Sequence, residues 1–191
     1  MWTRNLCTIL ACCAALWSCA HAKLGRVDVP LTGGVRKEIP ILVETISSNL
    51  MGFSGDNAEN RQRQAQEREL IEQEYAPAIV NALNEKGFRA QLGSGGFVEG
   101  RALTLSGYVS EFEHGSKAAR VMVGFGAGAA ELYTHFTLTD NGNDTVVTEF
   151  EILSTSGGRS GQYGFHTSLP GHISDTADAV AQYLATGRYR R

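Results

Sequence analysis

The stretch that decides the fold runs from residue 131 to residue 153 and reads ELYTHFTLTDNGNDTVVTEFEIL. Within its first ten positions one set of side chains alternates with another, which is the pattern of a β-strand with one buried face. The first set is Leu132, Thr134, Phe136 and Leu138, and the second is Tyr133, His135, Thr137 and Thr139. Asn141-Gly142 then gives the strongest short-range signal for a hairpin turn, because both residues accept a positive φ. A second strand follows from residue 145. We therefore predict two antiparallel neighbouring strands.

Other segments extend this sheet. Leu103, Leu105 and Val109 alternate with polar neighbours and predict a further strand. Residues 39–46 are rich in β-branched side chains, and Pro40 marks the start of a strand there. Since a short segment at 88–92 precedes the flexible glycine turn at 93–96, we expect about four or five strands in all.

A long helix is predicted between the first strand and the rest of the sheet. Asp56 and Glu59 resemble a capping box, and Gly87 supplies a left-handed stop. Pro77 removes a backbone donor inside this helix, so we expect either a kink or two helices that meet near Ala76. The apolar residues that recur at helical spacing are Ile71, Tyr75, Ala78, Ile79, Ala82 and Leu83.

A second helix closes the chain. Ser174 or Asp175 is its expected N-cap, and it ends before Gly187. Its inward-facing residues are Ala177, Val180, Ala181 and Leu184. Because the strands are grouped apart from the helices, the predicted fold class is α+β, an antiparallel sheet with the long helix and the C-terminal helix on one face.

The N-terminus predicts export. All of the cysteines lie within the first nineteen residues, around an apolar run that is too short to span a bilayer. Leu16-Trp17-Ser18-Cys19 resembles a lipoprotein cleavage site in which Cys19 receives the lipid. A competing cut exists after Ala22, because Ala20-His21-Ala22 fits ordinary signal peptidase. The cysteines concerned are Cys7, Cys12, Cys13 and Cys19.

These signals divide the chain into a signal peptide at 1–18, a loose lipid-anchored tether at 19–38, a single domain at 39–187 and a tail at 188–191. Ala20 after the cysteine predicts an outer-membrane lipoprotein that faces the periplasm, and the alternative is a soluble periplasmic form. The formal net charge is −3, which argues against nucleic acid as a ligand. No cysteine remains for a disulfide, and no cofactor is expected.

The least usual segment is GSKAARVMVGFGAG, residues 115–128. Its glycines lack the spacing and the following helix that a dinucleotide site needs, and no lysine and hydroxyl pair closes it as a phosphate loop. Nucleotide binding is therefore not predicted. Glycine in strands marks bulges and close backbone approach, so the segment is interpreted as a hairpin connection or a twisted edge strand. A surface for a protein partner or a lipid headgroup is the other interpretation.

This segment, followed by a strand ending in Leu138-Thr139-Asp140, resembles the hallmark of a family of small bacterial envelope lipoproteins, numbered 4410 among the domains of unknown function. The resemblance covers roughly Ile41 to Leu184 and implies an α+β lipoprotein with no assigned catalytic residues. Family members usually carry a basic residue after the glycine run, where this chain has Ala129-Ala130. The motif residues taken as a binding or structural site are Gly115, Ser116, Arg120, Gly124, Phe125, Gly126 and Gly128.

One cluster could carry chemistry. Glu111 and Glu113 lie on one strand face beside His114, where a metal could be held with the distant His135 or His166. A solvated strand end explains these residues equally well, and they lack the fixed spacing of zinc sites, so no metal is predicted.

Two further candidates are weaker. His166 and His172 flank a turn at 169–171 and are interpreted as exposed loop residues. Gly158-Arg159-Ser160-Gly161 is followed by Gln162 where a nucleophile elbow needs glycine, so no serine hydrolase is predicted.

Three functions stay open on the sequence. The first is a non-enzymatic accessory or assembly lipoprotein that binds an envelope protein through the glycine run and an adjoining sheet edge. The second is a binder of a lipid or small envelope ligand in the groove between sheet and helices. The third is a metal-dependent hydrolase built on Glu111, Glu113 and His114.

Overall fold

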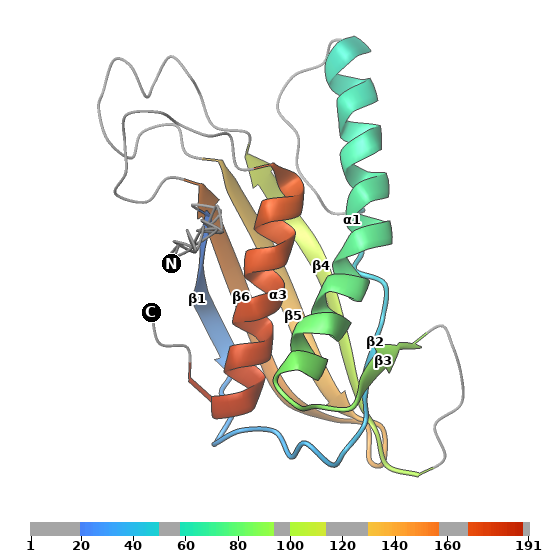
Figure 1. Ribbon diagram of the computed structural model, residues 1–191, viewed down its shortest axis with the longest axis vertical. Coiled ribbons are helices and arrows are strands. Elements are labelled where there is room, and N and C mark those ends of the chain that lie inside the picture. The colour runs from blue at the N-terminus through green and yellow to red at the C-terminus, as the bar shows by residue number, and fades with distance from the viewer. Residues whose placement is uncertain (1–19, 50–57, 94–99, 114–129, 157–167, 189–191) are drawn as a thin grey trace, which may run out of the picture.

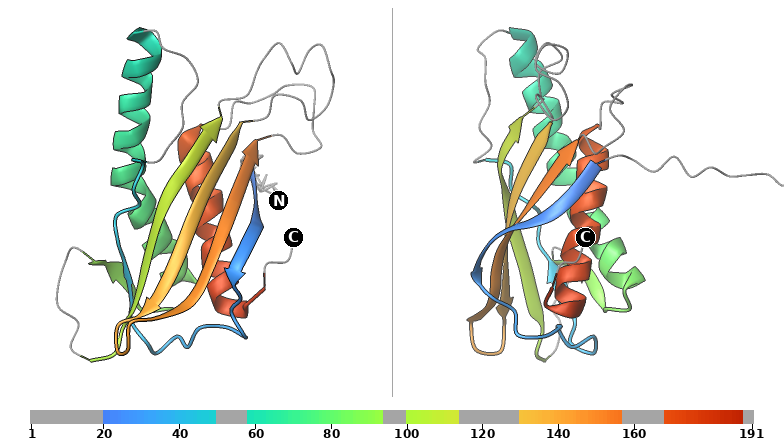
Figure 2. Two further views of the ribbon diagram at one scale, coloured as in Figure 1. Left: turned by 180° about the vertical axis from the view of Figure 1, so that it is seen from behind. Right: turned by 90° about the vertical axis from the view of Figure 1, so that its left-hand side faces the viewer.

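The computed structural model describes residues 20–49, 58–93, 100–113, 130–156 and 168–188 (Figure 1). They form one sheet whose strands lie in the order β1-β6-β5-β4-β2-β3. Two helices cover a single face of this sheet, and the other face is left open by the described elements (Figure 2). The strands are β1 (Ala20–Val29), β2 (Ile41–Val43), β3 (Ala90–Leu92), β4 (Leu103–Glu113), β5 (Glu131–Asp140) and β6 (Thr145–Ser156), and the helices are α1 (Ala58–Glu85) and α3 (Leu169–Thr186).

The α+β class is confirmed, but the sheet is larger than predicted and is mixed. Strand β2 pairs in parallel with both β3 and β4, whereas β4, β5, β6 and β1 pair antiparallel in turn. For β2 and β3 the reason is the crossover through α1. A helical connection returns the chain to the end of the sheet where it started, so the next strand runs in the same direction.

Strand β1 corrects the prediction of a loose tether. Residues 20–29 pair antiparallel with β6, and Ala22 is buried in the hydrophobic core. Register shifts interrupt this pairing between Leu24 and Val27 and again between Val27 and Val29. Because each bulge breaks the period of two, the alternation of a strand cannot be read from these residues.

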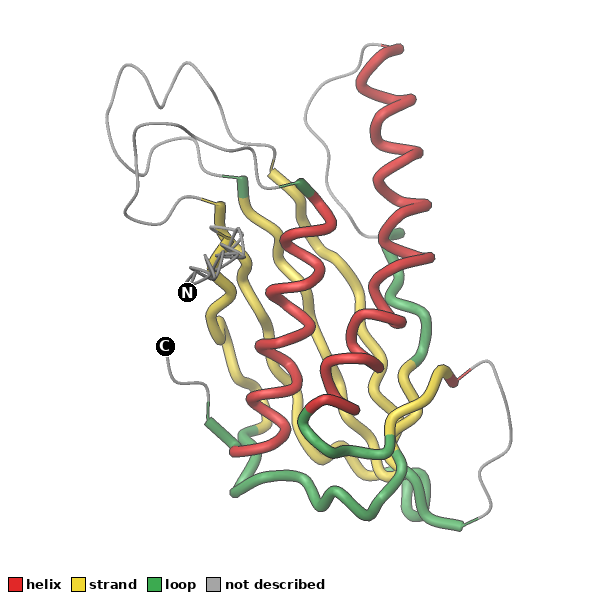
Figure 3. Tube along the Cα trace, viewed as in Figure 1, coloured by secondary structure: helices red, strands yellow, loops and turns green. Residues whose placement is uncertain are grey.

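The long helix α1 is continuous from residue 58 to residue 85 with Pro77 inside it, so of the two predicted alternatives the structure shows the single helix. The tube drawn in Figure 3 shows its axis bending partway along, as expected for an interior proline. Gly87 has φ of 85° and forms the predicted left-handed stop. Asp56 lies outside the described residues.

The last helix starts earlier than predicted. Its N-cap is Ser168 rather than Ser174 or Asp175, and Pro170 lies in its first turn, where a missing N–H costs no helical hydrogen bond. Gly187 ends it in the left-handed conformation with φ of 66°.

The hairpin between β5 and β6 is confirmed, but its turn differs from the prediction. The positive φ falls on Asp144 (53°), whereas Asn141 and Gly142 do not adopt one. The Gly142 N–H donates to the Asp140 carboxylate at 3.0 Å, and Arg101 donates to the same carboxylate at 2.5 and 2.8 Å. These bonds hold the pKa of Asp140 below its usual value.

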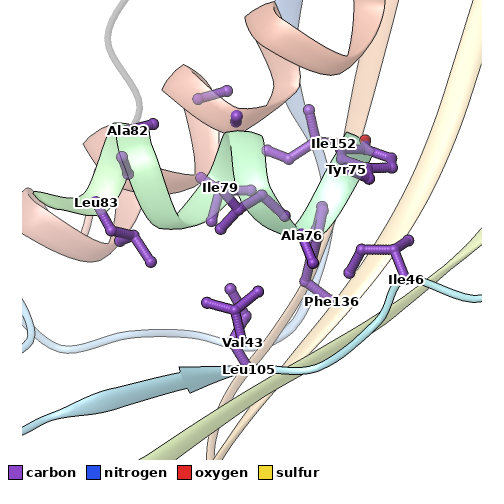
Figure 4. Packing of buried hydrophobic residues seen from close by; sticks show 14 of the residues in the cluster. Val43, Ile46, Tyr75, Ala76, Ile79, Ala82, Leu83, Leu105, Phe136 and Ile152 are labelled. Atoms are coloured by element: carbon purple, nitrogen blue, oxygen red, sulfur yellow. The ribbon is translucent and has the colours of Figure 1, made fainter. Parts of the chain in front are cut away.

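The core lies between the sheet and the two helices (Figure 4). Phe136 of β5 is fully buried, stacks on Phe150 at a centroid distance of 5.4 Å, and meets Tyr75 of α1 edge to face at 6.3 Å. The Tyr75 hydroxyl in turn hydrogen-bonds Thr134 at 2.8 Å. Among the described helices, none is both long and apolar enough to cross a bilayer.

Candidate functional site

One end of the sheet gathers the features that the sequence singled out. Strand pairing aligns His21 of β1, Thr155 of β6, Glu131 of β5 and Glu113 of β4 in a single row across four strands. We call this row and the strand ends beside it the anchor end. The start of α3 lies at the same end of the sheet (Figure 1).

The glycine run connects β4 to β5 at the anchor end. These two strands are antiparallel neighbours in the interior of the sheet, so neither of the strands that flank the run is an edge strand. The motif residues Gly115, Ser116, Arg120, Gly124, Phe125, Gly126 and Gly128 lie outside the described residues, and so does Cys19.

The acidic side chains predicted to share a strand face do so. Glu111 and Glu113 are exposed on the open face of β4, where they pair with Tyr133 and Glu131 of β5. The Tyr133 hydroxyl donates to the Glu131 carboxylate at 2.8 Å. That hydrogen bond, together with burial and the nearby carboxylates, raises the pKa of Tyr133 to about 12.

His135 does not join this acidic group. Its imidazole stacks on Tyr108 at a centroid distance of 4.9 Å, and its Nε2 lies 3.2 Å from a Glu151 oxygen on β6. His114 and His166 lie outside the described residues. Across the described part of the chain, no three His, Cys, Asp or Glu side chains are placed to hold a metal ion.

The buried side of the anchor end holds a polar pair that the sequence missed. His172 is fully buried in the first turns of α3, so its interpretation as an exposed loop residue is wrong. Its Nδ1 lies 2.9 Å from the Ser154 hydroxyl, and burial lowers the pKa of His172 to about 4. His172, Thr176 and Val180 are four residues apart, which puts them on one face of a helix. Extending the predicted helix by one turn toward its N-terminus would therefore have placed His172 on the buried face.

The distance between the Ser154 hydroxyl and the His172 imidazole is that of a catalytic serine and its histidine base, but the resemblance ends there. A serine hydrolase needs a hydroxyl that a substrate can reach, and both Ser154 and His172 have 0% exposed surface. In this conformation the pair is part of the packing of α3 against β4 and β6, where the His172 ring also meets Phe112 edge to face at 6.0 Å.

A pocket of about 280 Å³ lies at the opposite end of the sheet, beside the segment that joins β1 to β2. The described residues between sheet and helices are packed as a core, so this pocket is not the groove that the sequence predicted. Its lining includes Arg36 and Arg101 with Leu31, Val35, Ile39 and Val147.

Comparison with known proteins gives the family. The chain belongs to the family described as a domain of unknown function, DUF4410, whose model matches residues 41–187. The match confirms the resemblance and leaves β1 outside the matched region. No match is found among curated protein sequences.

Two solved structures are similar to this chain. The PelC dodecamer from Paraburkholderia phytofirmans is 15% identical, with 81% of this chain and 97% of that chain covered and a TM-score of 0.45. A homologue of a neuraminyllactose-binding hemagglutinin from Helicobacter pylori is 7% identical, with 81% and 91% covered and a TM-score of 0.38.

Proposed function

We propose that this member of the family is a lipid-anchored protein of the bacterial outer membrane that faces the periplasm and binds an envelope protein partner without catalysing a reaction. The position of β1 favours a lipid anchor on Cys19 over cleavage after Ala22. A cut before Cys19 keeps the whole strand, whereas a cut after Ala22 removes the three residues that pair with Ser154, Thr155 and Ser156. Ala22, a core residue, would be lost with them.

The lipid anchor is tested by labelling with palmitate. We expect the wild-type chain to incorporate the label and Cys19→Ala to incorporate none, because the thiol of Cys19 accepts the lipid. Cys13→Ala is the matched control, since Cys13 is removed with the signal, and it should label as the wild type does. A mature N-terminus at Lys23 would show that the anchor is absent.

Partner binding is supported by the open face of the sheet. No described element covers this face (Figure 2). It presents Tyr108, which is 37% exposed, and Tyr133 on the neighbouring strand. Aromatic side chains of this kind are enriched where proteins bind one another. The side chains on the same face also include Glu111, Glu113, His135 and Glu151.

The partner is tested by crosslinking in intact cells followed by capture of the lipidated protein. We expect a stoichiometric partner with the wild type and its loss in Gly126→Val, while the melting temperature stays unchanged because β4 and β5 pair outside the glycine run. Val146→Ala, at the far end of the sheet, should keep the partner. If Gly126→Val folds normally and retains every partner, the glycine run has no part in binding. If the wild type itself captures none, the small-ligand alternative is favoured.

A further inference from the structure

No linker separates the proposed lipid from the folded sheet. Strand β1 begins at Ala20, the residue directly after Cys19, and its pairing with β6 starts at that same residue. Consecutive Cα atoms are about 3.8 Å apart, so a lipid on Cys19 holds the start of β1 at the membrane surface. A flexible linker would have left the orientation of the protein free, and here the chain leaves little such freedom.

Strands β6, β5 and β4 reach the same level as the edge strand β1. The row of His21, Thr155, Glu131 and Glu113 runs perpendicular to the strands, and neighbouring strands lie about 4.8 Å apart, so Glu113 is roughly 15 Å sideways from the anchor strand. Val146 is nine residues along β6 from this row, which at about 3.3 Å per residue places it roughly 30 Å further from the anchor end.

The charges at the anchor end indicate which kind of lipid surface fits. Glu111 and Glu113 are exposed there, and Glu131 lies beside them with its carboxylate accepting from Tyr133. Lys23 of β1 stands in the same cross-strand row as Glu111, so these two rows hold three carboxylates and one ammonium. An anionic membrane surface repels carboxylates held close to it. Zwitterionic headgroups carry no net charge and present ammonium groups that can meet these carboxylates.

We propose that the anchor end is a membrane-contact surface that rests against zwitterionic phospholipid headgroups, with the strands pointing away from the bilayer. This inference rests on the proposed lipid anchor at Cys19. It assigns the hairpin turn at 141–144 and the pocket beside Arg101 to the end that faces the periplasm.

Depth-dependent fluorescence quenching tests this orientation. The mature chain has no cysteine besides Cys19, whose sulfur carries the lipid, so a cysteine introduced at one exposed strand position takes a fluorescent probe specifically. Glu113→Cys places the probe at the anchor end and Val146→Cys, at a residue that is 42% exposed, places it at the far end. The labelled lipoproteins are incorporated into phosphatidylcholine and phosphatidylethanolamine vesicles that contain lipids with nitroxide near the headgroup.

We expect a large loss of fluorescence from the probe at position 113 and little loss at position 146. Equal quenching at the two positions, or stronger quenching at 146, would overturn the orientation. Palmitate incorporation and flotation with the vesicles are measured on the same samples. If the protein carries no lipid and does not float, it is the anchor itself that has failed. If it carries lipid and floats but the probe at 113 is not quenched, the anchor stands and the contact surface is wrong.

Discussion

Replacing Phe136 with alanine is expected to lower the free energy of unfolding by about 3–5 kcal/mol, the range for truncating a fully buried phenylalanine. The ring lies in the middle of β5, with no exposed surface, between Phe150, on which it stacks, and Tyr75, which it meets in a T-shaped contact. Removing it leaves a cavity where the sheet meets α1, and neither the strand nor the helix can close that space without breaking its own hydrogen bonds.

The measurement is urea denaturation followed by far-ultraviolet circular dichroism, because both tryptophans, Trp2 and Trp17, lie in the predicted signal peptide. Thr137→Ala is the matched control. It is the next residue along the same strand, its side chain lies on the open face, and it should change the free energy of unfolding by no more than about 0.5 kcal/mol. A loss below about 1 kcal/mol for Phe136→Ala would mean that its site repacks easily, contrary to the packing described here.

The parts of the fold that local pattern determines were predictable from the sequence. The alternation in β5 and the turn-rich residues after Asp140 specify the hairpin, and Gly87 and Gly187 end their helices as expected. Glu111 and Glu113 share a face because the period of a strand is two. Each of these features depends on residues that are close in the chain.

What the sequence did not reveal depends on distant contacts. Strand β2 has three residues, and its parallel pairing with β3 follows from the α1 crossover rather than from its own pattern. The bulges in β1 hide its alternation. His172 was assigned to a loop because Pro170 suggested a turn, whereas a proline in the first turn of a helix is well tolerated.

The glycine pair at 33 and 34 gives the second large effect, because one of the two glycines lies against the end of α3. A Cβ atom on Gly34 would overlap the carbonyl oxygen of Ala185, and the next residue, Val35, donates its N–H to the Leu184 carbonyl at 2.7 Å. The atoms that the Cβ would meet are the backbone carbonyl oxygen and carbon of Ala185, so a side-chain rotation cannot relieve the clash. The segment that joins β1 to β2 crosses this end of the sheet (Figure 3), and it would have to lift away from α3.

We therefore expect Gly34→Val to lower the free energy of unfolding by about 3 kcal/mol, the upper part of the range for forcing atoms into a packed site. Gly33→Ala is the control in the same turn. Gly33 has φ of 81° with nothing within 4 Å of an added Cβ, so alanine there meets only the cost of the left-handed conformation, roughly 1 kcal/mol. The two variants are compared by urea denaturation. If Gly33→Ala lowers the free energy of unfolding more than Gly34→Val does, then backbone conformation, rather than contact with α3, is the reason that glycine is needed in this pair. In that case the segment does not depend on close approach to the helix.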